Sequence, residues 1–200
     1  DVWFEREVRP QLGGSSALVR YADDFVLCFE HADDAAYVWG ILEQRFKSFG
    51  LALHPKKTRS FVFQPPRNGG GGGGATFDFL GFTVHWQRTR SGGWRMACRT
   101  RGARLRRAIN AATEWCRRHR HDSVKAQHRA LVRKLNGHYN YFGVNGNGQA
   151  LGRLGYAVER AWRKWLNRRS QRARMNWKRF AQLLAANPLP AATIRVQIWP

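Results

Sequence analysis

The sequence predicts an α+β protein in which a β-hairpin, a helix and antiparallel strands precede an all-α helical bundle. Short apolar runs separated by polar turns, which are typical of strands, lie in the first half of the chain. From Gly102 onward, apolar residues recur at helical spacing. The chain has 200 residues, of which 43% are hydrophobic and 24% charged, so it can bury a core and is not wholly disordered. No membrane span and no signal peptide is readable.

The first 64 residues combine helical and strand patterns. Residues 1–12 carry apolar side chains at helical spacing, which predicts a helix. Two apolar runs within residues 17–29 flank Ala-Asp-Asp, which predicts a β-hairpin. Residues 33–49 predict a second helix, with acidic residues in the first turn and a glycine directly after it. Residues 51–53 and 60–63 are predicted to be strands around a His-Pro-Lys-Lys turn.

The middle of the chain contains a six-glycine tract, Gly69–Gly74, which predicts a flexible tether. A strand is predicted over residues 76–84, and another after the Ser91–Gly93 turn. Beyond Gly102, four apolar stripes predict four helices whose arginines face outward.

Charge is distributed very unevenly along the chain. The net charge is +22; residues 1–60 contain 8 Lys and Arg against 9 Asp and Glu, and the remaining residues contain 27 against 4. The positive charges of residues 61–200 repel one another, and this repulsion is tolerable only where a polyanion lies beside them. We therefore expect this part of the chain to bind nucleic acid rather than a membrane.

Three cysteines lie far apart and form no CxxC motif, which argues against a zinc module or a disulfide framework. They are predicted to be reduced, mostly buried thiols of an intracellular protein. Four histidines, at 119, 121, 128 and 138, have no carboxylate or thiol partner at ligand spacing, so they are expected to contact RNA or the core.

Asp23 and Asp24 are the residues most suggestive of catalysis. Adjacent carboxylates on a tight turn repel each other, but they suit Mg²⁺, which takes carboxylate and substrate phosphate oxygens. Two such ions can activate a hydroxyl and stabilise the leaving group in phosphoryl transfer. The alternative is ordinary turn chemistry, since aspartate favours turns.

The ordered motifs resemble the group II intron-encoded reverse transcriptase/maturase family. Tyr21-Ala-Asp-Asp24 between apolar strands resembles the catalytic hairpin of reverse transcriptases. Gly50-Leu-Ala-Leu-His-Pro-Lys-Lys-Thr58 resembles the next polymerase motif, and Phe77-Asp-Phe-Leu-Gly-Phe82 the primer-grip strand. Residues 137–142, 168–172 and 187–190 resemble the thumb, or maturase X, region of that family.

The resemblance implies a division of the chain. Residues 1–64 would be the C-terminal part of a reverse-transcriptase palm, 65–75 a glycine-rich linker, 76–101 a primer-grip-like β segment and 102–200 a helical thumb/maturase domain. The implied activity is RNA-directed DNA polymerisation together with intron RNA binding. The implied partners are dNTP, an RNA template with a DNA primer, and structured intron RNA in a cytoplasmic ribonucleoprotein; whether the protein forms a homodimer is left open.

The resemblance also implies roles for individual residues. Asp23 and Asp24 would bind magnesium in a two-metal site completed by an aspartate outside this chain. Tyr21 and Ala22 would flank the primer terminus, and Phe79, Leu80 and Gly81 would hold the primer. Lys56 or Lys57 would lie near the phosphates of the incoming nucleotide, although a solvated turn lysine is an equal alternative; likewise, the phenylalanines could simply face the core.

The arginines of the helical region are predicted to bind RNA phosphates. They lie on two segments, the first comprising Arg104, Arg106, Arg107, Arg117 and Arg118, with Arg120 beside them, and the second comprising Arg168, Arg169, Arg172 and Arg174.

One departure from the family limits the expected activity. The palm strand that supplies a further aspartate, and the fingers, should precede Asp23, but only twenty-two residues do so. This sequence is therefore expected to be a C-terminal fragment that is inactive alone. Two alternatives are a non-catalytic, RNA-binding maturase remnant that assists splicing and a general basic nucleic-acid-binding protein.

Overall fold

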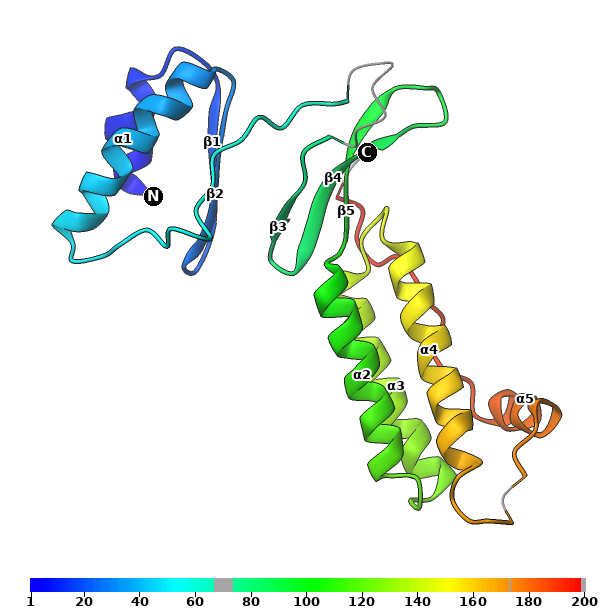
Figure 1. Cartoon of the computed structure of the whole chain (residues 1–200). Helices are drawn as coiled ribbons and strands as arrows, with labels where there is room; N and C mark the ends of the chain where they lie inside the picture. The colour runs from blue at the N-terminus through cyan, green and yellow to red at the C-terminus, as the bar shows by residue number, and fades with distance from the viewer. Residues whose placement is uncertain (67–73, 173, 199–200) are drawn as a thin grey trace. The chain divides into compact units, whose positions relative to one another are not determined.

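The computed structural model describes residues 1–66, 74–172 and 174–198, which form two compact units, Asp1–Ala75 and Thr76–Pro200 (Figure 1). The fold is α+β, as predicted, with two small antiparallel sheets and several helices. Apart from Gly74, the predicted glycine tether lies outside the described residues. Within the described ranges, no helix has both the length and the apolar character needed to cross a membrane.

The first unit contains the predicted hairpin between two helical segments. Its elements are the π-helix η1 (Phe4–Val8), the 3₁₀-helix η2 (Arg9–Gln11), the strands β1 (Ser16–Tyr21) and β2 (Asp24–Phe29), and the helix α1 (Ala32–Ser48). β1 and β2 pair antiparallel from Ser16 opposite Phe29 to Tyr21 opposite Asp24, which leaves Ala22 and Asp23 as the turn.

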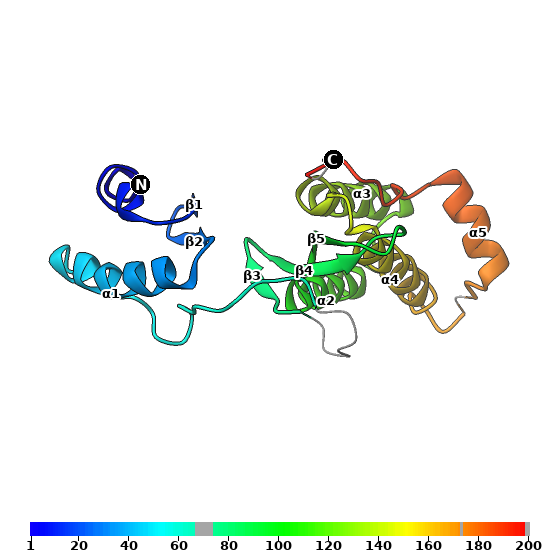
Figure 2. The same ribbon diagram turned by 90° about the horizontal axis from the view of Figure 1, so that it is seen from above.

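The helical segments of this unit cover one face of the hairpin only (Figures 1 and 2). The small core contains Phe4, Val8 and Val38, with Leu18 and Leu27 of the hairpin packed against it. Because strand side chains alternate between faces, the opposite face carries Ala17, Val19, Tyr21, Asp24, Val26 and Cys28. Val19 is 51% and Tyr21 68% exposed, so this face is open.

The strands predicted at residues 51–53 and 60–63 are wrong, because these residues lie outside any strand. Gly50, at φ 68°, ends α1, and the backbone N–H of Leu51 donates to the carbonyl of Phe46 at 2.9 Å. This bond closes the C-terminus of the helix, so the amide of Leu51 serves as a helix cap instead of joining a sheet.

The second unit combines a three-stranded sheet with four helices. Its elements are β3 (Phe77–Phe79), β4 (Phe82–Arg88), β5 (Trp94–Thr100), α2 (Gly102–Arg118), α3 (Val124–Phe142), α4 (Gly148–Leu166) and α5 (Trp177–Ala186), and the strand order is β3-β4-β5. The four predicted helices are confirmed. α2, α3 and α4 run side by side, and α5 lies against one end of α4 (Figures 1 and 2).

The single strand predicted over residues 76–84 is instead two strands joined by a tight turn. Leu80 and Gly81 have positive φ values of 49° and 83°, as a two-residue hairpin turn with the type I′ twist requires. Phe79 therefore pairs with Phe82 across the turn. Periodicity alone missed this, because a leucine rarely adopts a left-handed conformation.

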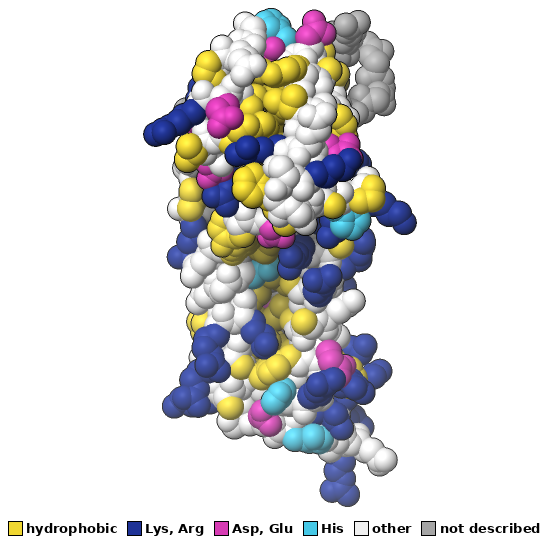
Figure 3. Space-filling model, turned by 90° about the vertical axis from the view of Figure 1, so that its left-hand side faces the viewer, with side chains coloured by type: hydrophobic (Ala, Val, Ile, Leu, Met, Phe, Trp, Pro, Cys, Tyr) yellow, Lys and Arg dark blue, Asp and Glu magenta, His cyan; other side chains and the backbone are white. Residues whose placement is uncertain are grey.

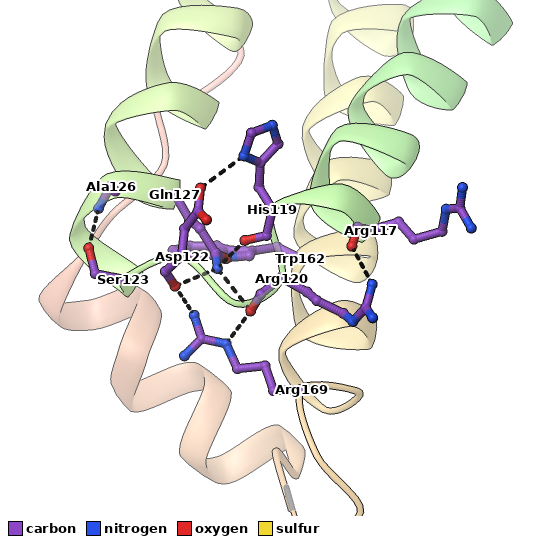
Figure 4. A network of polar contacts seen from close by, with 9 residues as sticks. All are labelled: Arg117, His119, Arg120, Asp122, Ser123, Ala126, Gln127, Trp162 and Arg169. Atoms are coloured by element: carbon purple, nitrogen blue, oxygen red, sulfur yellow. Dashed lines mark hydrogen bonds and ion pairs between the residues drawn. The ribbon is translucent and has the colours of Figure 1, made fainter.

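A buried polar network holds the helical bundle together (Figure 4). Gln127, only 1% exposed, donates from its side-chain amide to the carbonyls of His119 at 2.8 Å and Asp122 at 2.9 Å. Its side-chain oxygen accepts from Nε1 of Trp162 at 2.7 Å. Gln127 thus joins the α2–α3 turn, α3 and α4, inside a core that includes Leu131, Trp162 and Phe180.

A second buried amide links the sheet to the bundle. The side chain of Asn147 donates to Thr100 Oγ1 at 2.8 Å and to the carbonyl of Phe142 at 2.7 Å, and it accepts from the backbone N–H of Thr100 at 2.8 Å. The end of β5 is therefore held at the α3–α4 connection.

Close packing of α3 against α4 requires glycine at position 155. A Cβ atom there would lie 2.8 Å from the hydroxyl oxygen of Tyr139, which is fully buried, whereas a Cβ at Gly152 meets nothing within 4 Å. We expect Gly155→Ala to lower the free energy of unfolding by about 1–3 kcal/mol through overpacking. Gly152→Ala, on the same helix, should raise it by about 1 kcal/mol. Chemical denaturation checks both.

Tyr139→Phe provides the control for this assignment. The buried hydroxyl of Tyr139 has no hydrogen-bond partner among the described residues, so its removal should not destabilise the protein. The double variant Gly155→Ala/Tyr139→Phe should recover most of the lost stability. Equal losses in the single and double variants would contradict the proposed clash.

Candidate active site and nucleic-acid interface

The tip of the first hairpin exposes two adjacent carboxylates. Asp23 lies in the turn and Asp24 begins β2, and both side chains are exposed. Ala22 before them has φ 54°, in the left-handed region that costs a non-glycine residue about 1 kcal/mol. Residues in strained backbone conformations cluster at functional sites, which makes this turn a candidate functional site.

The cation nearest in sequence to these carboxylates is engaged elsewhere. Arg20 donates through Nε and Nη2 to the carboxylate of Asp1 at 2.7 and 2.6 Å, and through Nη1 to the carbonyl of Ala22 at 3.0 Å. Within the described residues, no ion pair or side-chain hydrogen bond engages Asp23 or Asp24. Both carboxylates are thus available to an external cation.

Exposed, unpaired carboxylate oxygens fit Mg²⁺, which binds one or two carboxylates and completes its shell with water and phosphate oxygens. Across residues 1–66, 74–172 and 174–198, no group of three or more His, Cys, Asp or Glu side chains comes together. Asp23 and Asp24 therefore form part of a metal site at most, and the roles predicted for them from the sequence remain predictions.

Lys56 and Lys57 lie in an exposed turn after α1. The backbone N–H of Lys57 donates to the carbonyl of His54 at 3.0 Å, and the N–H of Lys56 to the ring nitrogen Nδ1 of His54 at 3.3 Å. These bonds fix the backbone and leave both ammonium groups in solvent. No described contact joins either lysine to the hairpin tip, so both alternatives for them remain open.

The primer-grip candidates Phe79, Leu80 and Gly81 occupy the β3–β4 turn, where they are half-buried. The hydroxyl of Tyr141 on α3 donates to the carbonyl of Leu80 at 2.9 Å. A Cβ at position 81 would lie 3.4 Å from the ring of Phe142. The turn therefore rests on the end of α3, and its conformation is set by the helical bundle.

Most of the arginines predicted to bind RNA are exposed. Those of α2 are Arg104, Arg106, Arg107, Arg117 and Arg118, and those after α4 are Arg168, Arg172 and Arg174. The face in Figure 3 shows Lys and Arg side chains spread over the helical part of the molecule with few acidic ones between them. This distribution fits an electrostatic footprint for nucleic acid.

Arg169 is the exception. Its guanidinium group is half-buried and donates to the carbonyls of Arg120 and Asp122 in the α2–α3 turn (Figure 4). These carbonyls are near the end of α2, where a cation is favourable. Through these contacts Arg169 joins the segment after α4 to the α2–α3 turn. Its position in the sequence alone did not indicate this structural role.

The four acidic residues of the second unit leave most of its cations unneutralised. Asp78 pairs with Arg101 at 2.9 Å, and Glu114 pairs with Arg117 at 2.8 Å and Arg118 at 2.7 Å. Nδ1 of His119 lies 2.9 Å from a carboxylate oxygen of Asp122, so His119 does have a carboxylate neighbour, although no group of three or more metal-ligating side chains comes together among the described residues. Among the described residues, these are the ion pairs of this unit.

The cysteine prediction holds in part. All three thiols are free, but only Cys116 is buried, while Cys98 is half-buried and Cys28 exposed. Burial raises the pKa of the Cys116 thiol to about 12, so this side chain is an inert part of the core.

The sequence patterns missed a basic hollow between α2 and α4. It has a volume of about 460 Å³ and is lined by Thr113, Tyr156, Ala157, Arg160, Ala161, Arg163 and Lys164. Tyr156 is 59% exposed, and the Arg160 guanidinium lies 5.5 Å from the centre of its ring. The spacing of Tyr156, Arg160 and Lys164, four residues apart on one helix face, is the signal that could have revealed it.

Comparison with known proteins gives one result for the first part of the chain. Residues 3–84 match the family model of reverse transcriptases, described as RNA-dependent DNA polymerases. This match supports a reverse transcriptase. The matched residues contain the hairpin with Asp23 and Asp24, the Lys56–Lys57 turn and the β3–β4 turn, and they end within β4. No curated protein is similar enough to the chain to be matched.

We expect the carboxyl of Glu114 to titrate at an unusually low pH, because two arginines, Arg117 and Arg118, contact it. Their hydrogen bonds and charges lower the pKa of the Glu114 carboxyl from 4.5 to about 2. Since the folded-state pKa lies below that of the unfolded chain, these ion pairs stabilise α2 fully above about pH 4.5 and are lost as the pH falls toward 2. NMR titration of the side-chain carboxyls measures this directly.

Glu159 is the matched control, because burial raises the pKa of its carboxyl above 4.5. The two glutamates should therefore titrate in opposite directions from the ordinary value. Arg117→Ala should raise the pKa of Glu114 while leaving that of Glu159 unchanged. An ordinary midpoint for Glu114 would show that its contacts with the two arginines do not persist in solution.

Proposed function

We propose that this chain is the C-terminal part of a group II intron-type reverse transcriptase/maturase, which copies RNA into DNA and binds the intron RNA. The observation that carries the proposal is the pair of exposed, unpaired carboxylates at a strained hairpin tip inside the segment matching reverse transcriptases. Reverse transcriptases act on nucleic acid and dNTP and generally use Mg²⁺.

In this proposal, Asp23 and Asp24 bind Mg²⁺, and a further carboxylate from outside the described residues completes a two-metal site. Bound Mg²⁺ would supply electrostatic stabilisation of the transferring phosphoryl group. Tyr21 shares the open hairpin face with Asp24. Tyr21 and Ala22 would flank the primer terminus. Lys56 or Lys57 would bind the phosphates of the incoming nucleotide.

The second unit would hold the nucleic acid. The turn formed by Phe79, Leu80 and Gly81 would contact the primer strand, supported from behind by Tyr141. The exposed arginines of α2 and of the segment after α4 would bind RNA phosphates, since few acidic groups compete for them. Residues 1–64 would then act as palm, 76–101 as primer grip and 102–200 as thumb/maturase domain.

Polymerase activity tests the catalytic part of the proposal. We expect Asp23→Asn to lower dNTP incorporation on poly(rA)·oligo(dT) by about 10²- to 10⁴-fold, because a metal ligand is lost. The assay uses this chain together with the polypeptide segment that supplies the remaining palm carboxylate. Asp33→Asn, an exposed aspartate in the first turn of α1, is the control and should retain activity. Unchanged incorporation by Asp23→Asn would refute the catalytic assignment.

A non-catalytic, RNA-binding maturase remnant is the second candidate. It is favoured by the absence, among the described residues, of a third metal-binding side chain near Asp23 and Asp24, and by the basic charge of the second unit. Both candidates predict that group II intron RNA competes better than random RNA of equal length at matched salt. Equal competition would favour a general basic nucleic-acid-binding protein instead. Incorporation of dNTP then separates the two maturase candidates.

A further inference from the structure

The hollow between α2 and α4 brings together small side chains, an exposed aromatic ring and cations. Its floor consists of small side chains, Ala157 and Ala161. Its rim carries an exposed aromatic ring, Tyr156, and the cations Arg160 and Lys164. Its volume of about 460 Å³ lies within the range of about 300–1,000 Å³ that is usual for small-ligand sites.

The rim residues form one ridge along α4. Positions 156, 160 and 164 are each four residues apart, so their side chains follow one another at about 6 Å intervals along the helix. Arg160 donates from Nη1 to the hydroxyl of Tyr156 at 3.2 Å, and its guanidinium lies over the ring, 5.5 Å from the ring centre. Neither Arg160 nor Lys164 has an acidic partner within the part of the chain that the structure describes.

The third cation of the hollow is already engaged. Arg163 donates from Nη1 to the carbonyl of Met175 at 3.2 Å, and its guanidinium lies 3.9 Å from the ring centre of Trp177. Arg163 therefore attaches α5 to α4. Arg160 donates to Tyr156, and Nζ of Lys164 lies 5.4 Å from the ring centre of Trp165, but neither cation has an acidic partner among the described residues. Both can therefore bind an anionic ligand, which makes the hollow cationic and aromatic at once.

We propose that this hollow binds an unpaired nucleotide of single-stranded nucleic acid, with its base stacked on Tyr156 and its phosphates bound by Arg160 and Lys164. Aromatic rings and guanidinium planes stack on bases that are not covered by neighbouring bases, and cations track the backbone. In a continuous duplex the base faces are hidden, so Tyr156 has nothing to stack on. The inference rests on the proposed nucleic-acid binding by the second unit.

The test compares single-stranded and duplex ligands on the complete chain. The probes are oligo(U) and oligo(dT) of about 12 nucleotides, within the usual site sizes for single strands, and a blunt RNA duplex of equal length. We expect Tyr156→Ala to weaken binding of single strands by about five- to a hundredfold and to leave duplex binding unchanged. Tyr156→Phe, which keeps the ring, should bind as the unaltered protein does.

Arg160→Ala separates the phosphate contribution. It should weaken single-strand binding and reduce the slope of log affinity against log salt by about 0.7. Arg133→Ala, an exposed arginine of α3 outside the hollow, controls for lost charge and should not alter the preference between single strands and duplex. Because Tyr156 is exposed, circular dichroism of each variant should be unchanged.

The outcomes distinguish this inference from the function on which it rests. Equal losses for single strands and duplex in Tyr156→Ala, or no loss for either, would refute the hollow while leaving nucleic-acid binding intact. A chain that binds none of the probes would refute both. Equal effects with oligo(U) and oligo(dT) would assign the site to the unpaired base and phosphate common to both, whereas a loss confined to oligo(U) would make it an RNA site.

Discussion

The helices of the second unit are joined at one buried amide, the side chain of Gln127. Gln127 satisfies carbonyls in the α2–α3 turn and the indole N–H of Trp162, so three helices meet at a single side chain. Leaving a polar group of this network unpaired in the core would cost about 1–3 kcal/mol. Gln127 and its partners avoid this cost by forming hydrogen bonds with one another. Because these hydrogen bonds fix the interior, the helices can carry arginines on their outer faces. These arginines add little to the core, and their charges repel one another.

That repulsion connects structure and function. Asp78 and Glu114 of the second unit pair with three arginines, Arg101, Arg117 and Arg118, and most of the other guanidinium groups have no counter-charge among the described residues. A bundle of this composition is most stable when a polyanion supplies the missing charge. The first unit has nearly balanced charge, and its exposed carboxylates instead suit a cation. The charge of the second unit therefore suits an anionic partner, whereas the carboxylates of the first unit suit a cation.

Local patterns predicted most of the secondary structure. Helical periodicity identified the four bundle helices, and Ala-Asp-Asp between apolar runs identified the first hairpin. The errors arose where a residue had two local options. Leu51 lies in an apolar run that suggests a strand, but its amide caps α1. Leu80 belongs to a strand-like run, yet it adopts a left-handed turn supported by Tyr141 and Phe142.

The sequence by itself determined the α+β class, the charge division and the adjacency of Asp23 and Asp24, because these follow from composition and from neighbours in the chain. The tertiary structure decided which charged groups are available. Only folding engages Arg20 with Asp1, directs Arg169 to the carbonyls of the α2–α3 turn and gathers Thr113 with the Tyr156–Lys164 ridge. These arrangements join residues that are distant in sequence or lie on different helices, so they depend on how the elements pack and not on local periodicity.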